Sequence, residues 1–154
     1  MANYVMSDLH GHYNQYLMML DKIGFSDSDM LYILGDIVDR GPHPVKILQD
    51  LMKRPNVCCI AGNHEVMFLK NIKFLLQEIT ENSIAALDED TTASLVNWMQ
   101  NGAGPTIAEF SALDKSLRNA ILDFVADFEI YEEVYTENSD FLLVHAGLGN
   151  YSPD

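Results

Sequence analysis

The stretch Gly35-Asp36-Ile37-Val38-Asp39-Arg40-Gly41 follows the apolar run Met30-Leu31-Tyr32-Ile33-Leu34. A short apolar run that ends at a glycine is typical of a buried strand passing into a loop. This loop carries two carboxylates and an arginine beside the second one. Its flanking glycines let the backbone turn closely around whatever the carboxylates bind. The loop is a candidate site, although two acids and an arginine also occur in solvated surface loops.

Two similar units flank this one in the chain. Residues 3–6 form a β-prone run that ends at Ser7-Asp8-Leu9-His10-Gly11, and residues 56–61 form another that ends at Gly62-Asn63-His64-Glu65. Helical spacing of apolar residues follows each of the three loops. Three strand-loop-helix units in succession predict an α/β fold with a parallel sheet covered by helices. Since ligands bind at the carboxyl edge of such sheets, we expect the three loops to converge there.

The remainder of the chain reads as helices followed by a hairpin. Apolar stripes between residues 66 and about 127 predict three helices, which we interpret as an insertion over one side of the sheet. We interpret these stripes as core packing, and Trp98 as architectural. Alternating apolar residues over 129–135 and 140–145 predict two paired strands. We therefore expect one domain over residues 1–154.

Composition and charge restrict the possible partners. The chain has 154 residues, 48% of them hydrophobic, and a formal net charge of -14. Such a chain should fold, and its charge disfavours both nucleic acid and an anionic membrane surface as partners. The adjacent Cys58 and Cys59 are the only cysteines and cannot sensibly bridge each other. Without a signal peptide or a long apolar window, we expect a cytoplasmic protein.

The loops contain the donors of a metal site. Asp8 and His10, two residues apart in a segment taken as extended, can bind one ion together. Asp36 has two oxygens and can bridge two ions, while Asn63 offers a carbonyl oxygen and His145 an imidazole. These ligand types, without cysteine, suit manganese, iron(II) or zinc rather than a structural zinc site. Two divalent cations about 3.5–4 Å apart, with a bridging hydroxide, are a recurrent device for hydrolysing phosphate esters.

Four blocks in order resemble a known family: Asp8-Leu9-His10-Gly11, Gly35 to Gly41, Gly62-Asn63-His64-Glu65 and His145-Ala146-Gly147. They are similar to the signature blocks of the calcineurin-like metallophosphoesterases. The match is closest to the phosphoprotein phosphatase branch, which includes bacteriophage lambda phosphatase, bacterial serine/threonine phosphatases and symmetrical diadenosine tetraphosphatases. The resemblance implies a metallophosphoesterase-type β-sandwich flanked by helices. It also implies two divalent metal ions, manganese first, with iron or zinc as alternatives.

The resemblance further implies a role for each matching residue. Five side chains would hold the two metals: Asp8, His10 and Asp36 the first, and Asp36, Asn63 and His145 the second. His64 would donate a proton to the leaving oxygen, and Asp39 would orient its ring. Arg40 and Asn63 would contact the phosphoryl group of the substrate. Glu65 is interpreted as a helix-start or supporting residue.

The chain departs from the family after the His145 block. Family members continue well beyond it, with a later histidine that completes the second metal and another arginine that contacts phosphate. This chain has neither. We therefore expect a C-terminally truncated member that lacks the last strands of its second sheet. Such a chain would expose an unpaired edge and could form a homo-oligomer through it.

Three functions agree with these residues. The main interpretation is a bacterial-type serine/threonine protein phosphatase that hydrolyses phosphate monoesters, with a phosphorylated protein or a small phosphoester as substrate. One alternative is a hydrolase similar to the symmetrical diadenosine tetraphosphatases. The other is a catalytically impaired fragment that binds metal or phosphate and oligomerises. All these substrates present the same phosphoryl group, so the residues alone do not choose between them.

Overall fold

A computed structural model of the protein describes residues 1–76 and 88–147. The stretch 77–87, part of the region predicted as helical, lies outside the described residues. The first sheet has the order β1-β2-β3 and consists of β1 (Asn3–Met6), β2 (Met30–Leu34) and β3 (Val57–Ile60). Both strand pairs are parallel. The parallel sheet predicted from the sequence is therefore confirmed.

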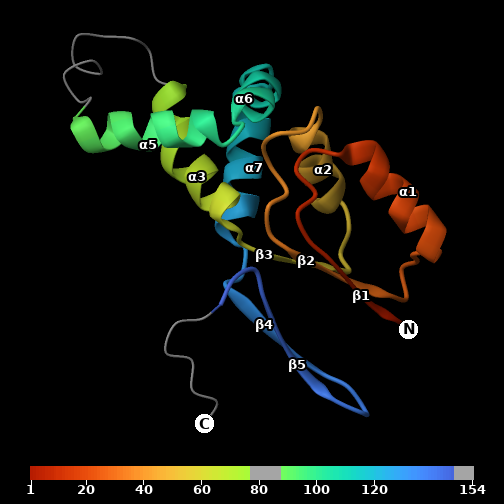
Figure 1. The fold of residues 1–154 in the computed structure, drawn as a ribbon. Helices are drawn as coiled ribbons and strands as arrows, with labels where there is room; N and C mark the ends of the chain where they lie inside the picture. Colours follow the sequence, from red (N-terminus) through yellow and green to blue (C-terminus); the bar gives the residue numbers. More distant parts are fainter. Residues whose placement is uncertain (77–87, 148–154) are drawn as a thin grey trace.

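Two helices connect these strands. Helix α1 (Tyr13–Ile23) joins β1 to β2, and α2 (Pro44–Leu51) joins β2 to β3. Since the strands are added in chain order and crossovers between parallel strands are right-handed, both helices lie on the same face of the sheet (Figure 1). Helix α1 stops at Gly24, whose φ of 62° is the left-handed conformation that ends many helices.

The other described helices lie on that same face (Figure 1). They are α3 (Asn63–Leu75), α5 (Glu89–Gln100), α6 (Gly104–Ser111) and α7 (Lys115–Ala126). Asp88 and Asp114 cap α5 and α7 by accepting hydrogen bonds from backbone N–H groups. The sequence predicted no helix at α6, because this short segment opens with Gly-Pro and buries only Thr106 and Phe110.

The core lies between the first sheet and this helical layer. Leu31 and Ile33 of the central strand β2 are fully buried, whereas β1 is a half-exposed edge. Most of the predicted apolar stripes face the core, including Phe68 and Ile121. The prediction of core packing was wrong for a few members that lie on the outer faces of their helices and are exposed: Leu75, Val96 and Met99.

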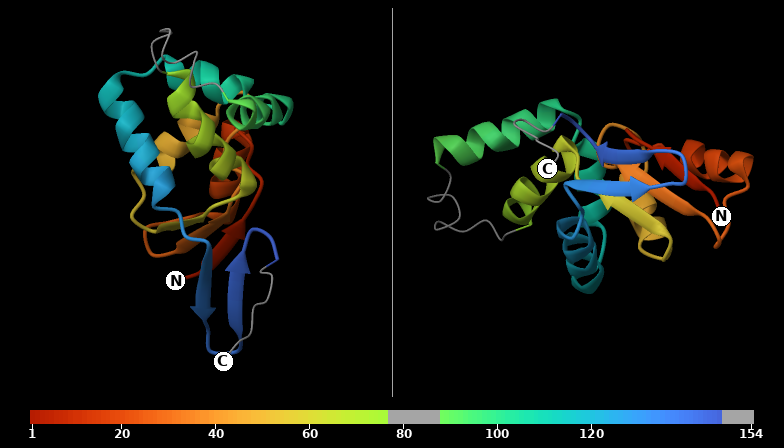
Figure 2. Two further views of the ribbon diagram at one scale, coloured as in Figure 1. Left: turned by 90° about the vertical axis from the view of Figure 1, so that its left-hand side faces the viewer. Right: turned by 90° about the horizontal axis from the view of Figure 1, so that it is seen from below.

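A hairpin forms a second sheet on the other side of the first. Strands β4 (Tyr131–Tyr135) and β5 (Asp140–Val144) pair antiparallel, as predicted, and lie opposite the helices (Figure 2). Glu129 connects the two sheets: its N–H donates to the Cys59 carbonyl and its carbonyl accepts from the Ala61 N–H. A cavity of about 220 Å³ between the sheets is lined from both, by Tyr32 and Val134 among others. This arrangement confirms the α/β fold with two facing sheets; the domain limits stay a prediction.

The surface of the hairpin carries several exposed apolar side chains. Ile130, Tyr131 and Phe141 are exposed, with Ile130 reaching 72%. On β3, Cys59 is buried and Cys58 is partly buried, and burial raises the pKa of both thiols. Within residues 1–76 and 88–147, no helix has the length and apolar character needed to cross a lipid bilayer.

Candidate active site

The predicted site residues converge on one edge of the first sheet, and their backbone is unusual. Across the described ranges, the non-glycine residues with positive φ are all site residues predicted from the sequence: Asp8 (56°), His10 (40°), Asp36 (55°), Asp39 (70°) and Arg40 (67°). This region of φ costs L-residues about 1–3 kcal/mol each, so the surrounding structure must hold them there. Strained residues of this kind cluster at functional sites.

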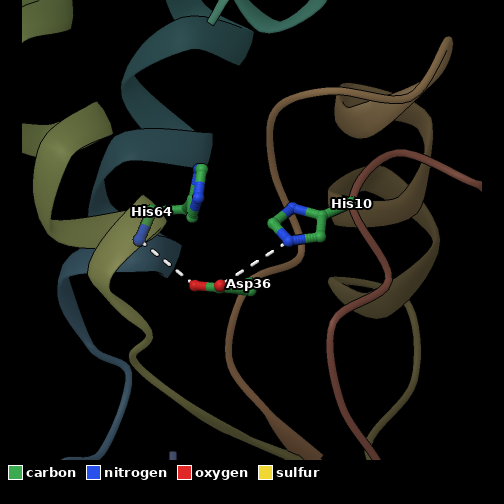
Figure 3. A group of neighbouring side chains, drawn as sticks. All are labelled: His10, Asp36 and His64. Carbon is green, nitrogen blue, oxygen red and sulfur yellow. Dashed lines mark hydrogen bonds and ion pairs between the residues drawn. The ribbon is translucent and has the colours of Figure 1, made fainter. Parts of the chain in front are cut away.

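Asp36 lies at the centre of the site. It lies two residues after the end of β2, and its carboxylate is buried. Oδ2 lies 3.6 Å from Nε2 of His10, and Oδ1 lies 3.5 Å from Nε2 of His145. His10 comes from the loop after β1 and His145 from the end of β5, so Asp36 stands between ligands delivered by both sheets. Figure 3 shows the His10 side of this arrangement.

Backbone carbonyls determine which ring nitrogen of each histidine faces Asp36. Nδ1 of His10 donates to the Val38 carbonyl at 2.9 Å, and Nδ1 of His145 donates to the Leu34 carbonyl at 2.7 Å. A carbonyl oxygen only accepts, so both Nδ1 atoms carry a proton. When the imidazole is neutral, each ring therefore directs the lone pair of Nε2 toward the site, which is the form that binds a metal ion.

Two more predicted ligands complete the arrangement. The Asn63 carbonyl oxygen lies 3.2 Å from Nε2 of His145, and an Asp8 oxygen lies 3.9 Å from Nε2 of His10. Asp8 is 58% exposed at the rim. The expectation that Asp8 and His10 share an extended segment was wrong, since both are left-handed; the turn itself brings them together. On each side of Asp36, carboxylate, amide and imidazole ligand atoms lie 3.2 to 3.9 Å from one another, and this donor set fits a cation.

His64 lies close to the same ligands. His10, Asp36 and His64 offer ligand atoms within 4.8 Å of one another (Figure 3). The His64 backbone N–H also donates to Asp36 Oδ1 at 3.2 Å, because His64 is in the first turn of α3. Its Nδ1 donates to Asp39 Oδ2 at 2.7 Å, and both side chains are 0% exposed. His64 is thus a fully buried histidine paired with a fully buried carboxylate.

Arg40 joins the two histidines. Its guanidinium, which can only donate, gives one N–H to Nε2 of His10 at 2.8 Å and another to Nε2 of His64 at 3.0 Å. The Arg40 backbone N–H donates to the Gly102 carbonyl at 2.8 Å, which ties the loop to the end of α5. A methyl group on Gly102 would meet the Arg40 side chain at 2.9 Å, so the close approach requires glycine.

Three supporting residues were missed or underestimated by sequence reasoning. Trp98 and Thr106 both donate hydrogen bonds to Asp39, although the sequence assigned Trp98 to packing and gave Thr106 no role. Glu65 is completely buried, and its carboxylate accepts from four backbone N–H groups, those of Asp36, Ile37, Val38 and Gly62. Glu65 therefore holds the turn that carries Asp36. The Gly62-to-Glu65 spacing of a helix start was the only available signal for this role.

Replacement of Glu65 by glutamine is expected to destabilise the fold by at least about 2 kcal/mol. Each carboxylate oxygen accepts from two amides. The glutamine NH₂ group cannot accept, so two buried N–H groups would be left unpaired at about 1–3 kcal/mol each. Urea denaturation measures the change. Glu109→Gln, at a partly exposed carboxylate that accepts from one backbone N–H, is the control and should cost less. Equal effects would contradict a special role for Glu65.

Comparison with known proteins identifies the family. The sequence profile of the calcineurin-like phosphoesterases matches residues 3–152. The chain belongs to this family. The family generally uses two divalent metals, and the group at Asp36 is a candidate for binding them. The resemblance expected from the four sequence blocks is therefore confirmed at the level of the family, while the identity of the metal is open.

Curated relatives from several bacteria are described as "Bis(5'-nucleosyl)-tetraphosphatase, symmetrical". The relative from Nitrosomonas europaea is 28% identical over 150 residues, covering 96% of this chain and 45% of the relative. The one from Wigglesworthia glossinidia brevipalpis is 32% identical over 105 residues, covering 65% of this chain and 38% of the relative. The chain thus spans less than half the length of these curated relatives.

A solved structure provisionally described as a diadenosine tetraphosphatase has a similar fold. It has a TM-score of 0.61 and 19% identity, and the match covers 99% of this chain and 57% of that one. At this identity the likeness shows the fold alone.

The expectation of a serine/threonine protein phosphatase was wrong. The relatives found by sequence are named as symmetrical tetraphosphatases instead. The physical reason lies in the blocks on which that expectation depended. In their expected roles they contact only the metals and the phosphoryl group, which is the same in a phosphoprotein and in a dinucleoside polyphosphate. They therefore predict the reacting centre and carry no information about the rest of the substrate.

Proposed function

We propose that this chain is a metal-dependent hydrolase that cleaves the polyphosphate bridge of a dinucleoside tetraphosphate at its centre, releasing two nucleoside diphosphates. The observation that carries the proposal is Asp36, whose two carboxylate oxygens lie 3.6 and 3.5 Å from the Nε2 atoms of His10 and His145. The names of the relatives support the choice of substrate. The chain spans less than half the length of those relatives, so their activity does not by itself establish the activity of this chain.

The residues would divide between two metal ions around Asp36. Asp8 and His10 would hold one ion, and Asn63 and His145 the other, with Asp36 shared. Carboxylate, imidazole and amide ligands make manganese the first candidate, with iron and zinc next. When bound, a pair of divalent ions polarises phosphoryl oxygens and supplies hydroxide near neutral pH. The two carboxylates neutralise only part of such a charge, so the site attracts the anionic substrate.

His64 would supply the proton that the leaving phosphate oxygen needs. Nδ1 is bonded to Asp39, so Nε2 is the atom free to exchange a proton with the substrate. In the present geometry an Arg40 N–H donates to that same Nε2. Arg40 must therefore turn away before Nε2 can carry a proton. The guanidinium would turn to the phosphoryl oxygens, which its planar fork suits, and Asn63 would contact the same group.

Hydrolysis of diadenosine tetraphosphate tests this proposal. The purified chain with Mn²⁺ is expected to release ADP as the only nucleotide product, measured by anion-exchange chromatography, and EDTA should stop the reaction. ATP and AMP in equal amounts would contradict cleavage at the centre. Turnover that survives chelation would contradict the role of the metals. A homo-oligomer and a cytoplasmic location stay predictions, and light scattering tests the first.

A further inference from the structure

The Asp39 carboxylate is held by three side chains from three different helices. Nδ1 of His64 on α3 and Nε1 of Trp98 on α5 both donate to Oδ2, at 2.7 and 2.8 Å. The Thr106 hydroxyl on α6 donates to Oδ1 at 2.7 Å. Asp39, His64, Trp98 and Thr106 are all fully buried. Water therefore cannot replace any of these bonds in the folded protein.

The direction of each hydrogen bond is determined by its donor. The indole nitrogen of Trp98 can only donate. The Thr106 hydroxyl already accepts from the Asp39 backbone N–H at 2.9 Å, which leaves its own proton for Oδ1. Both groups therefore donate to Asp39, one to each carboxylate oxygen. With both oxygens already accepting, the third contact places the His64 proton on Nδ1 and leaves Nε2 toward the site.

We propose that Trp98 and Thr106 are positioning residues that orient the Asp39 carboxylate, and that they thereby hold His64 with its proton on Nδ1 and Nε2 toward the substrate. The role of His64 toward the leaving oxygen rests on the proposed function; the state of the His64 ring does not. If Trp98 served packing alone, its buried indole N–H could donate to any nearby acceptor, such as a backbone carbonyl. Trp98 instead bonds the same carboxylate oxygen as His64.

Nuclear magnetic resonance of the metal-free protein at neutral pH tests the contacts without activity. Trp98 is the only tryptophan, so its indole N–H signal is unambiguous. Asp39→Asn should shift this signal strongly, whereas Asp50→Asn, at a carboxylate bonded to Tyr16 and Arg54, should leave it in place. The ¹⁵N shifts of His64 should report a proton on Nδ1, and that form should decrease in Trp98→Phe and Thr106→Val. Unchanged signals in these variants would overturn the proposal.

Two aryl phosphates separate positioning from packing. Phenolate is more basic than 4-nitrophenolate. Hydrolysis of phenyl phosphate therefore depends more on a group that donates a proton to the leaving oxygen. Trp98→Phe and Thr106→Val should lower kcat for phenyl phosphate by about 10- to 100-fold, the usual loss when a supporting partner is removed. They should change kcat for 4-nitrophenyl phosphate little. Thr106→Ser, which keeps the hydroxyl, should restore most of the loss.

Phe110→Leu is the control for packing. Phe110 is buried against Phe68 and has no polar contact with Asp39, so this variant should affect both substrates equally. Equal losses on both substrates in Trp98→Phe and Thr106→Val would overturn the positioning role. Absence of metal-dependent turnover by the unmodified chain would contradict the proposed function instead, and the His64 tautomer would then decide the present proposal on its own.

Discussion

Replacement of His64 by alanine is expected to lower kcat for diadenosine tetraphosphate by about 10²- to 10⁴-fold, the usual contribution of a positioned acid or base. The side chain is fully buried, bonded through Nδ1 to Asp39, and its Nε2 lies at the ligand cluster. No other described histidine is placed in this way, because His10 and His145 direct Nε2 at Asp36. Steady-state kinetics with saturating Mn²⁺ measures the effect.

The metal content of the His64→Ala variant distinguishes a proton donor from a metal ligand. His64 belongs to neither proposed ligand set, so the variant should bind as many Mn²⁺ ions as the unmodified chain, measured by elemental analysis. Loss of an ion would contradict the acid role and make His64 a ligand, which its distance to His10 and Asp36 would allow. His12→Ala is the control: His12 is exposed, makes no side-chain cap bond at the start of α1, and should keep full activity.

Asp36→Asn is expected to remove both metal binding and activity. Loss of a residue that only supports a metal ligand costs about 10- to 100-fold, so loss of the shared ligand should cost more than about 100-fold. The variant is well matched to the site. Asparagine tolerates the φ of 55° at this position and can still accept the His64 N–H, while the negative charge is lost. Isothermal titration with Mn²⁺ measures the affinity.

The control for this variant is Asp50→Asn, which removes one negative charge from the Tyr16–Arg54 cluster outside the site. It should leave Mn²⁺ affinity unchanged. His145→Ala should remove one ion and keep the other, because Asp8, His10 and Asp36 remain. Retention of two ions by Asp36→Asn would show that Asp36 is not shared between them.

Much of the fold was predictable because it depends on short-range patterns. The runs over β1, β2 and β3 each end in a loop with polar residues. Because crossovers between parallel strands are right-handed, the helices that connect such strands in chain order lie on one face of the sheet. The antiparallel pairing of β4 and β5 followed from alternation around a short turn. Helix α6 was not predicted, because eight residues with only two buried side chains show almost no helical periodicity of apolar residues.

The amino-acid sequence by itself predicted which side chains gather at this edge of the first sheet. Asp8, His10, Asp36, Asn63 and His64 follow strands of one parallel sheet, whose carboxyl ends converge, and His145 follows β5 of the second sheet. Only the tertiary structure decided what surrounds Asp39. Trp98 and Thr106 lie 59 and 67 residues away in the chain, on helices whose own patterns indicate packing. Hydrogen bonds across such distances leave no periodicity in the sequence, because they depend on how the helices pack against one another.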